Sequence, residues 1–275
     1  MSTTTTEAVV NSLRVKDPEK SAEAMIPSTF LVEPAKDIKL TRIHFENTDL
    51  ADLSGCWAWI LDGVLSPEEC ALLVSVSRRR FDNAWDRVIS NEDENWDQVE
   101  ELTRMCDRAF WDLKSIWERI WKRIEDHVPE VKVLRDVPLV TGLSERKGDE
   151  GKMVWRLTGP NERARFIKYT EGEFINSHYD EFFQAADGKE MSFFTMHIFL
   201  NDSTSVLYEM DGEPLEGGCT VFHSSKDPSK AIEIEPKAGR LILFQQSNLL
   251  HSGEVVRKGV KVVMKTDLLY KCNDI

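Results

Sequence analysis

Residues 161–183 have the sequence NERARFIKYTEGEFINSHYDEFF, which joins a strand-like run to a candidate pair of metal ligands. Its first half contains the β-rich run ARFIKYT, and its second half places His178 and Asp180 two residues apart. In a strand, residues i and i+2 project from the same face, so these two side chains could aim at one point. Two ligands begin a metal site without completing it, so the rest of the chain must supply a third.

From about residue 163 onward, the hydrophobic pattern has the period of strands. The runs are short and β-rich, and Gly, Pro, Asp and Lys separate them. Strands at this density indicate a sandwich, a barrel or a jelly roll. The runs are ARFIKYT (164–170), SFFTMHIFL (192–200), CTVFH (219–223), AIEIE (231–235), RLILF (240–244) and VKVVMKTDLLY (260–270).

Before these strands, the sequence predicts helices. Ser66 is a good N-cap, with Pro67 at the first helical position and Glu69 completing a capping box. Apolar residues at three- and four-residue steps predict a second, longer helix over 91–128, where Pro129 ends the pattern. The residues of this pattern are Val99, Leu102, Cys106, Phe110, Leu113, Trp117, Ile120 and Ile124. Its tryptophans, Trp111, Trp117 and Trp121, are expected to pack in the core.

The domain organisation follows from this change of period. Residues 1–50 are poor in aromatic residues and predict a partly flexible N-terminal extension. Residues 51–275 are predicted to form one domain, because no linker divides them. Within it, helical support is expected over about 51–135 and a β core over about 155–270.

Composition excludes several classes of function. The net charge of −13 argues against a nucleic-acid partner and against docking on anionic lipid. No apolar run approaches the roughly 20 residues that span a bilayer, and the N-terminus lacks the pattern of a secretory signal. The five cysteines are scattered and show no CxxC spacing, so they predict buried thiols and a cytoplasmic, reducing location.

His251 is the candidate third ligand, since it lies between the predicted strands 240–244 and 260–270. Two histidines and one carboxylate form a facial triad, which leaves positions open on an octahedral metal, as in non-haem Fe(II) oxygenases. Taken alone, an HxD pair with a distant histidine is a weak signal, and a hydrogen-bonded surface pair remains the alternative.

Several segments together give the chain a family resemblance. It resembles the Fe(II)- and 2-oxoglutarate-dependent dioxygenases of the prolyl 4-hydroxylase type, particularly their fungal-like small soluble members. The matching segments occur in the order of that family and cover roughly residues 60–270. They are LDGVLSPEEC (61–70), NERARFIKYTEGEFINSHYD (161–180), FFTMHIFLND (193–202), LEGGCTVF (215–222), IEPKAGRLILFQ (234–245), LLHSG (249–253) and GVKVVMKTDLLY (259–270).

The resemblance implies a mostly β fold with supporting α, namely a double-stranded β-helix (jelly roll) buttressed by N-terminal helices. It also implies that His178, Asp180 and His251 bind Fe(II). The co-substrates would then be 2-oxoglutarate and O2, with ascorbate as an optional stimulant.

The resemblance further implies three residues that bind 2-oxoglutarate. Lys261, ten residues after His251, matches the basic residue for the distal carboxylate, and a fixed cation suits a dianion in a dry barrel. Tyr169 matches a tyrosine that hydrogen-bonds the co-substrate, and Thr195 matches a threonine that lines the same pocket. Both residues could instead be ordinary strand residues. Arg257 and Lys258 are competitors for the basic role, but their position before a turn favours a solvated face.

The expected activity is hydroxylation, or a related C–H oxidation, of a small-molecule metabolite. A prolyl or protein hydroxylase is the alternative within the enzyme class, and a non-catalytic β-helix that binds ligand is the alternative outside it. A zinc hydrolase could also use two histidines and an aspartate, but it would need neither Lys261 nor Tyr169. The sequence does not assign roles to His197, His223 or the loop 201–216.

Overall fold

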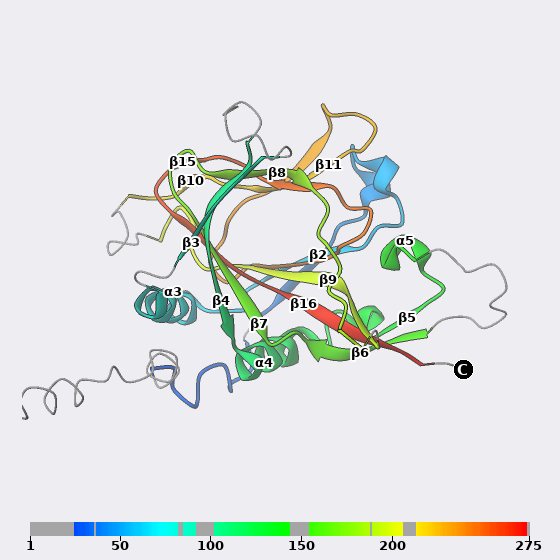
Figure 1. Ribbon diagram of the computed structural model, residues 1–275, viewed down its shortest axis with the longest axis horizontal. Helices are drawn as coiled ribbons and strands as arrows, with labels where there is room; N and C mark the ends of the chain where they lie inside the picture. Colours follow the sequence, from blue (N-terminus) through cyan, green and yellow to red (C-terminus); the bar gives the residue numbers. More distant parts are fainter. Residues whose placement is uncertain are drawn as a thin grey trace, which may run out of the picture.

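Antiparallel strands dominate the computed structural model, which describes residues 25–35, 37–81, 85–91, 102–143, 154–187, 189–205 and 213–273. Fourteen strands form one sheet that curls around the middle of the molecule (Figure 1). The strands are β1 (Lys39–Arg42), β2 (Ala58–Asp62), β3 (Asp86–Asn91), β4 (Leu102–Asp112), β5 (Val133–Arg135), β6 (Val154–Pro160), β7 (Arg163–Tyr169), β8 (Phe174–His178), β9 (Glu190–Phe199), β10 (Glu216–Gly217), β11 (Thr220–His223), β12 (Ala231–Ile234), β13 (Leu241–Gln245), β14 (His251–Gly253), β15 (Val256–Lys258) and β16 (Lys261–Asn273). The α-helices are α3 (Pro67–Phe81), α4 (Lys114–Ile124) and α5 (Pro138–Thr141), and 3-10 turns occupy Phe45–Asn47, Ala51–Leu53 and Pro129–Lys132.

The order of the strands explains how the sheet closes on itself. Along the sheet the order is β1-β2-β13-β9-β16-β7-β4-β8-β14-β11-β12, while β10 and β15 form a separate pair. Strands β7 and β8 pair with successive parts of one edge of β4, while β3 pairs with its other edge, so β4 runs alongside both halves of the jelly roll. This architecture confirms the predicted fold class, a mostly β jelly roll with supporting helices.

Side chains of the central strands alternate between two environments. On β9, Thr195, His197 and Phe199 face the interior of the curled sheet, whereas Met196 and Ile198 pack in the cluster that includes the helices. This alternation is the two-residue period of a strand whose faces are both buried. One face of each central strand therefore packs in the core, and the other is available to line a site.

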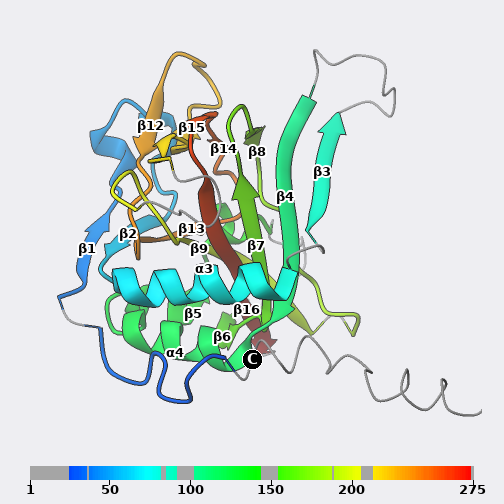
Figure 2. The same ribbon diagram turned by 90° about the vertical axis from the view of Figure 1, so that its left-hand side faces the viewer.

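Helices α3 and α4 lie next to each other on the outer face of the sheet (Figure 2). The predicted capping box of α3 is confirmed, because the Ser66 amide donates to Glu69 Oε2 (2.8 Å) and the Glu69 amide donates to Ser66 Oγ (3.2 Å). The predicted core tryptophans are also confirmed: Trp111, Trp117 and Trp121 are all buried. The helices thus support the sheet from its outer side.

The helix predicted over 91–128 is wrong for most of its length. Residues 92–101 lie outside the described residues, Leu102–Asp112 form strand β4, and only Lys114–Ile124 are helical. Strand β4 buries Cys106 on its inner face and Ala109 and Trp111 on its outer face. The pattern residues within β4 are Leu102, Cys106 and Phe110, and their four-residue spacing fits one face of a strand as well as a helical step.

The N-terminal part of the chain joins the fold through β1, which pairs with β2. Phe45 and Leu50, just after β1, are fully buried. Residues 1–24 of the predicted extension lie outside the described residues. Within the described ranges, no helix is long and apolar enough to cross a membrane.

Candidate metal centre and active-site cavity

Pairing between β8 and β14 brings the two predicted histidine ligands together. His178 is the last residue of β8 and His251 the first of β14, and they are direct partners in the antiparallel register. Their ring centroids are 4.3 Å apart. Asp180 reaches the same point from the segment just after β8, not from within the strand. From the sequence, His178 and Asp180 are expected to project from the same face of one strand. Instead, His178 and His251 meet through the pairing of β8 with β14, and Asp180 joins them from the segment after β8.

The three side chains converge on a small volume. His178 Nε2 lies 3.5 Å and His251 Nε2 lies 3.7 Å from Asp180 Oδ1. One ligand atom from each residue lies within 4.8 Å of the other two, and no other cluster of this kind occurs among the described residues. Two imidazoles and a carboxylate on one side of a metal are the donor set of non-haem Fe(II) oxygenases.

Backbone carbonyl groups fix the tautomers of both histidines. His178 Nδ1 donates to the Asn176 carbonyl (2.9 Å), and His251 Nδ1 donates to the Leu249 carbonyl (3.0 Å). Each ring therefore directs the lone pair of Nε2 toward Asp180, as metal-binding histidines require. The Nε2 atom of His251 is buried and has no hydrogen-bond partner within the described residues. An orphaned buried nitrogen beside a carboxylate fits a metal ligand.

Burial lowers the pKa of His251 to about 4, although the negative charge of Asp180 acts to raise that pKa. The imidazole is therefore neutral at neutral pH. Burial alone would raise the pKa of Asp180, but Lys265, His251, His178 and Thr195 together hold that pKa well below its ordinary value. Neither ligand has to lose a proton at neutral pH before it binds a metal.

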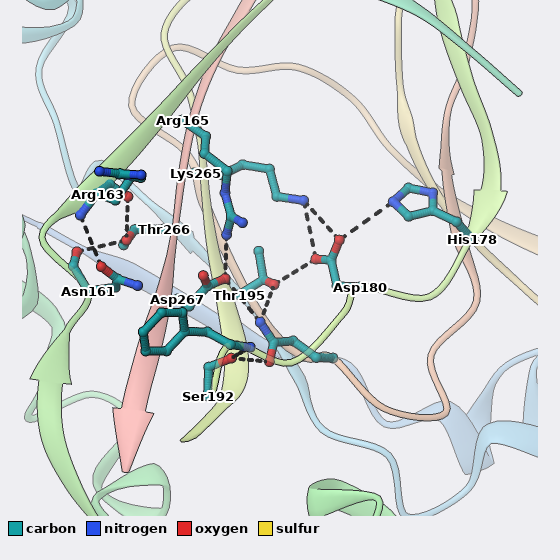
Figure 3. A network of polar contacts seen from close by, with 12 residues as sticks. Asn161, Arg163, Arg165, His178, Asp180, Ser192, Thr195, Lys265, Thr266 and Asp267 are labelled. Atoms are coloured by element: carbon teal, nitrogen blue, oxygen red, sulfur yellow. Dashed lines mark hydrogen bonds and ion pairs between the residues drawn. The ribbon is translucent and has the colours of Figure 1, made fainter. Parts of the chain in front are cut away.

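Two further side chains hold the Asp180 carboxylate in place (Figure 3). The Lys265 ammonium lies 3.1 Å from Oδ1 and 3.2 Å from Oδ2. The Thr195 hydroxyl donates to Oδ2 at 2.6 Å. These contacts orient an aspartate that no strand pairing restrains, and they leave Oδ1 facing the two histidines.

A cavity of about 380 Å³ opens beside the three ligands. Lys261, Tyr169 and His197 line it, together with all three candidate ligands. Thr195 is not among the lining residues, and its hydroxyl instead contacts Asp180. Its predicted contact with the co-substrate stays a prediction.

Lys261 is a buried cation in this cavity. It is 2% exposed, pairs with Tyr169 in the register of β16 and β7, and its Nζ lies 5.2 Å from the Tyr169 ring centroid. Burial lowers its pKa to about 8, with a further contribution from Lys265. Gly218 has a φ of +71°, and a Cβ atom there would lie 3.1 Å from Lys261 Cδ. A left-handed glycine thus makes room for the lysine stem.

Other residues considered from the sequence have clear positions. Arg257 is exposed, and Lys258 pairs with Glu213 at 2.8 Å, so neither side chain lines the cavity. His197 is buried, and burial, Lys265 and Lys261 keep its pKa well below the ordinary value. His223 is hydrogen-bonded to Ser252 (2.7 Å) outside the cavity. Residues 206–212 of the loop 201–216 lie outside the described residues.

Sequence reasoning missed four basic residues of the cavity wall. Arg104 and Arg108 lie on β4, in the segment wrongly predicted as a helix. Arg165 and Lys265 lie on β7 and β16. The two-residue period could have identified Lys265, because it lies four residues after Lys261 on one strand and therefore on the same face.

The family comparison agrees with this geometry. Residues 164–266 match the model of the 2OG-Fe(II) oxygenase superfamily, a segment that includes His178, Asp180 and His251. This segment therefore matches the domain of a superfamily whose members use Fe(II), 2-oxoglutarate and O2. The chain is a 2-oxoglutarate-dependent dioxygenase.

Solved structures with a similar chain path come from enzymes of different kinds. A viral collagen prolyl hydroxylase from Paramecium Bursaria Chlorella virus-1 is 17% identical, with 78% of this chain and 96% of that chain covered and a TM-score of 0.45. A Pseudomonas putida prolyl-4-hydroxylase is 14% identical, with coverage of 79% and 95% and a TM-score of 0.45. The carbocyclase SnoK from nogalamycin biosynthesis is 10% identical, with coverage of 91% and 85% and a TM-score of 0.46. No curated protein matches the sequence.

Proposed function

We propose that His178, Asp180 and His251 bind Fe(II) and that the enzyme oxidises a C–H bond of a small-molecule metabolite. The observation that carries this proposal is the convergence of the three ligand atoms beside a cavity that contains a buried lysine. Within the superfamily, we infer kinship with the prolyl 4-hydroxylase type, including its fungal-like small soluble members. The order of the motifs along the sequence supports that inference.

The iron would couple O2 activation to the oxidative decarboxylation of 2-oxoglutarate, with one oxygen atom entering the substrate, the other entering succinate, and CO2 leaving. The chain's own residues would bind and orient the reactants. The Lys261 ammonium would hold the distal carboxylate of 2-oxoglutarate, since a charge-assisted contact in a dry cavity is strong. The Tyr169 phenol is kept neutral because burial raises its pKa, so it can donate a hydrogen bond.

Thr195 would act mainly on the metal ligand. Its 2.6 Å hydrogen bond to Asp180 Oδ2 restrains the carboxylate while Oδ1 remains directed at the histidines. The predicted role in binding 2-oxoglutarate would require the hydroxyl to reach the cavity as well.

Cavity size supports a small substrate. The volume of about 380 Å³ is near the lower end of the usual range for small-molecule sites, about 300–1,000 Å³. This volume must also accommodate 2-oxoglutarate. One observation favours the alternative, a prolyl or protein hydroxylase: Tyr179, Phe182 and Phe183 are exposed aromatic residues next to the metal ligands, and such residues are common where peptides bind.

The deciding experiment is an anaerobic titration of Fe(II) and 2-oxoglutarate into the metal-free protein. A visible metal-to-ligand charge-transfer band is expected, and His178→Ala should lose it. Succinate should then form on admission of O2. A folded protein that gives no band, or that turns over with zinc alone, would favour a ligand-binding protein or a zinc hydrolase instead.

A further inference from the structure

Two arginines form one wall of the active-site cavity. Arg104 and Arg108 lie on β4 with Cys106 between them, and all three residues line the cavity. Their spacing of two and four residues places them on the inner face of the strand. Since β7 and β8 both pair with one edge of β4, this wall lies beside the strand of Tyr169 and the strand of His178.

The other cationic side chains of the cavity already have partners or proposed roles. Arg165 pairs with Asp267 (2.5 Å), and Lys265 pairs with Asp180 (3.1 Å). Lys261 is assigned to 2-oxoglutarate. Cations outnumber carboxylates in the lining, which contains Arg104, Arg108, Arg165, Lys261 and Lys265 against Asp180, Glu181 and Asp267.

Arg104 and Arg108 have no acidic partner within the ranges that the structure describes. Neither guanidinium forms an ion pair or a hydrogen bond there, and the Nε of Arg108 is buried without an acceptor. Cys106 does not offset their charge, because burial raises the pKa of its thiol to about 11 and keeps it neutral. A buried donor without an acceptor destabilises the folded protein.

On the opposite face of β4, by contrast, charged side chains form ion pairs. There Asp107 is paired with Arg87 (3.2 Å) and with Lys168 (2.8 Å). The chain has 48 acidic residues and a net charge of −13, so acidic partners are abundant. The two cavity arginines are therefore an exception, since they lack acidic partners in a chain that is rich in acidic residues. Unpaired charges of this kind are expected at functional sites.

We propose that the substrate is a small anion whose carboxylate or phosphate group is bound by Arg104 and Arg108. This inference rests on the proposed function and names the substrate class of that site. A guanidinium offers a planar pair of donors that matches a carboxylate or a phosphate. An uncharged prolyl side chain would leave both groups unpaired, so the arginine wall favours a metabolite.

The test uses benzoate and sulfate as probes of the carboxylate and phosphate classes, with benzamide as the uncharged counterpart of benzoate. Binding is measured by calorimetry on the enzyme loaded with Fe(II) and 2-oxoglutarate without O2. We expect the wild type to bind at least one of the two anions and not benzamide. Arg104→Gln and Arg108→Gln should each weaken anion binding about tenfold or more, since each removes a charge-assisted contact. The stronger of the two probes identifies the class.

Arg79→Gln is the matched control, because Arg79 is exposed on α3 outside the cavity, and its anion affinity should equal that of the wild type. Arg108→Lys should recover only part of the affinity, since an ammonium keeps the charge and loses the planar fork. Thermal unfolding checks the fold of each variant. Removal of one of two like charges should leave the midpoint unchanged or higher.

The charge-transfer band, recorded in the same samples, distinguishes a failure of the proposed oxygenase function from a failure of the anion proposal. If the band is absent from the wild type, the proposed function fails. If the band is normal, three results would overturn the anion proposal alone: no binding of either anion, equal binding of benzamide and benzoate, or unchanged anion affinity in both arginine variants.

Discussion

The Lys265 ammonium contacts both carboxylate oxygens of Asp180, at 3.1 Å and 3.2 Å. Oδ1 is also the oxygen that faces His178 and His251. A metal bound by the three ligands would thus share this oxygen with a fixed positive charge. Lys265 stabilises the metal-free carboxylate and competes electrostatically with a divalent cation.

We expect Lys265→Met to tighten metal binding and to destabilise the metal-free protein. Removing the ammonium removes repulsion of the metal, with an expected gain in affinity of about tenfold, or about 1.4 kcal/mol. The metal-free form would contain a largely buried carboxylate without its cation, so its thermal midpoint should fall. Co(II) titration by visible absorption and thermal unfolding measure the two effects. Lys168→Met, which breaks the 2.8 Å pair with Asp107 away from the triad, is the control; weaker Co(II) binding by Lys265→Met would contradict the prediction.

Removal of one histidine ligand should abolish metal binding without unfolding the protein. For His178→Ala we expect Co(II) affinity to fall about 100-fold or more, because one of three protein ligands is lost. His178 lies at the end of β8 and its side chain is 25% exposed, so truncation leaves little buried volume empty. His223→Ala is the matched control, since His223 lies on the neighbouring strand β11, hydrogen-bonded to Ser252. Equal Co(II) affinities in the two variants would remove His178 from the ligand set.

Lys261→Met should separate co-substrate binding from metal binding. Loss of one charge-assisted contact is expected to weaken 2-oxoglutarate binding about tenfold or more, or about 1.5–3 kcal/mol. Metal affinity should stay close to that of the wild type, because Lys261 contacts no candidate ligand. The free energy of unfolding without 2-oxoglutarate should rise, since an ammonium that is 2% exposed is replaced by an apolar side chain of similar length. Lys258→Met provides the control; an unchanged requirement for 2-oxoglutarate in Lys261→Met would reassign the anchor.

Local signals in the sequence were sufficient for some elements of the fold. The capping box of Ser66 and Glu69 depends on residues three apart, and the strands after residue 163 carry their own hydrophobic runs. Strand β4 could not be recognised in this way. Its apolar residues Leu102, Cys106 and Phe110 recur every four residues, and this spacing occurs on one face of a strand as well as on a helix, so it does not distinguish the two.

The same error concealed part of the candidate site. A helix over 91–128 would direct Arg104 and Arg108 away from Cys106, whereas in β4 all three residues line the cavity. The residues predicted as metal ligands do lie together, but sequence pattern alone did not bring His251 to His178. That contact depends on the register of β8 with β14, and the family resemblance supplied it before the structure did.

Binding of 2-oxoglutarate should weaken as the pH rises through about 8. Burial lowers the pKa of Lys261 from 10.5 to about 8, so the ammonium that would hold the co-substrate is lost above that pH. Above about pH 8 the affinity should fall by up to tenfold per pH unit, and binding should take up a proton. Lys261 has the opposite effect on the protein without co-substrate: between about pH 8 and 10.5 the unfolded chain holds this proton and the folded chain does not. Its contribution to the free energy of unfolding therefore rises with pH in that window.

Calorimetry in two buffers of different ionisation enthalpy, from about pH 7 to about pH 9.5, measures both the affinity and the proton uptake. Lys261→Met should bind weakly at every pH and take up no proton near pH 8, since it has no ammonium to lose. If the affinity of the wild type falls only above pH 10, or if Lys261→Met keeps the proton uptake, then another group holds the carboxylate. Arg104, whose guanidinium also lines the cavity, would be the next residue to test.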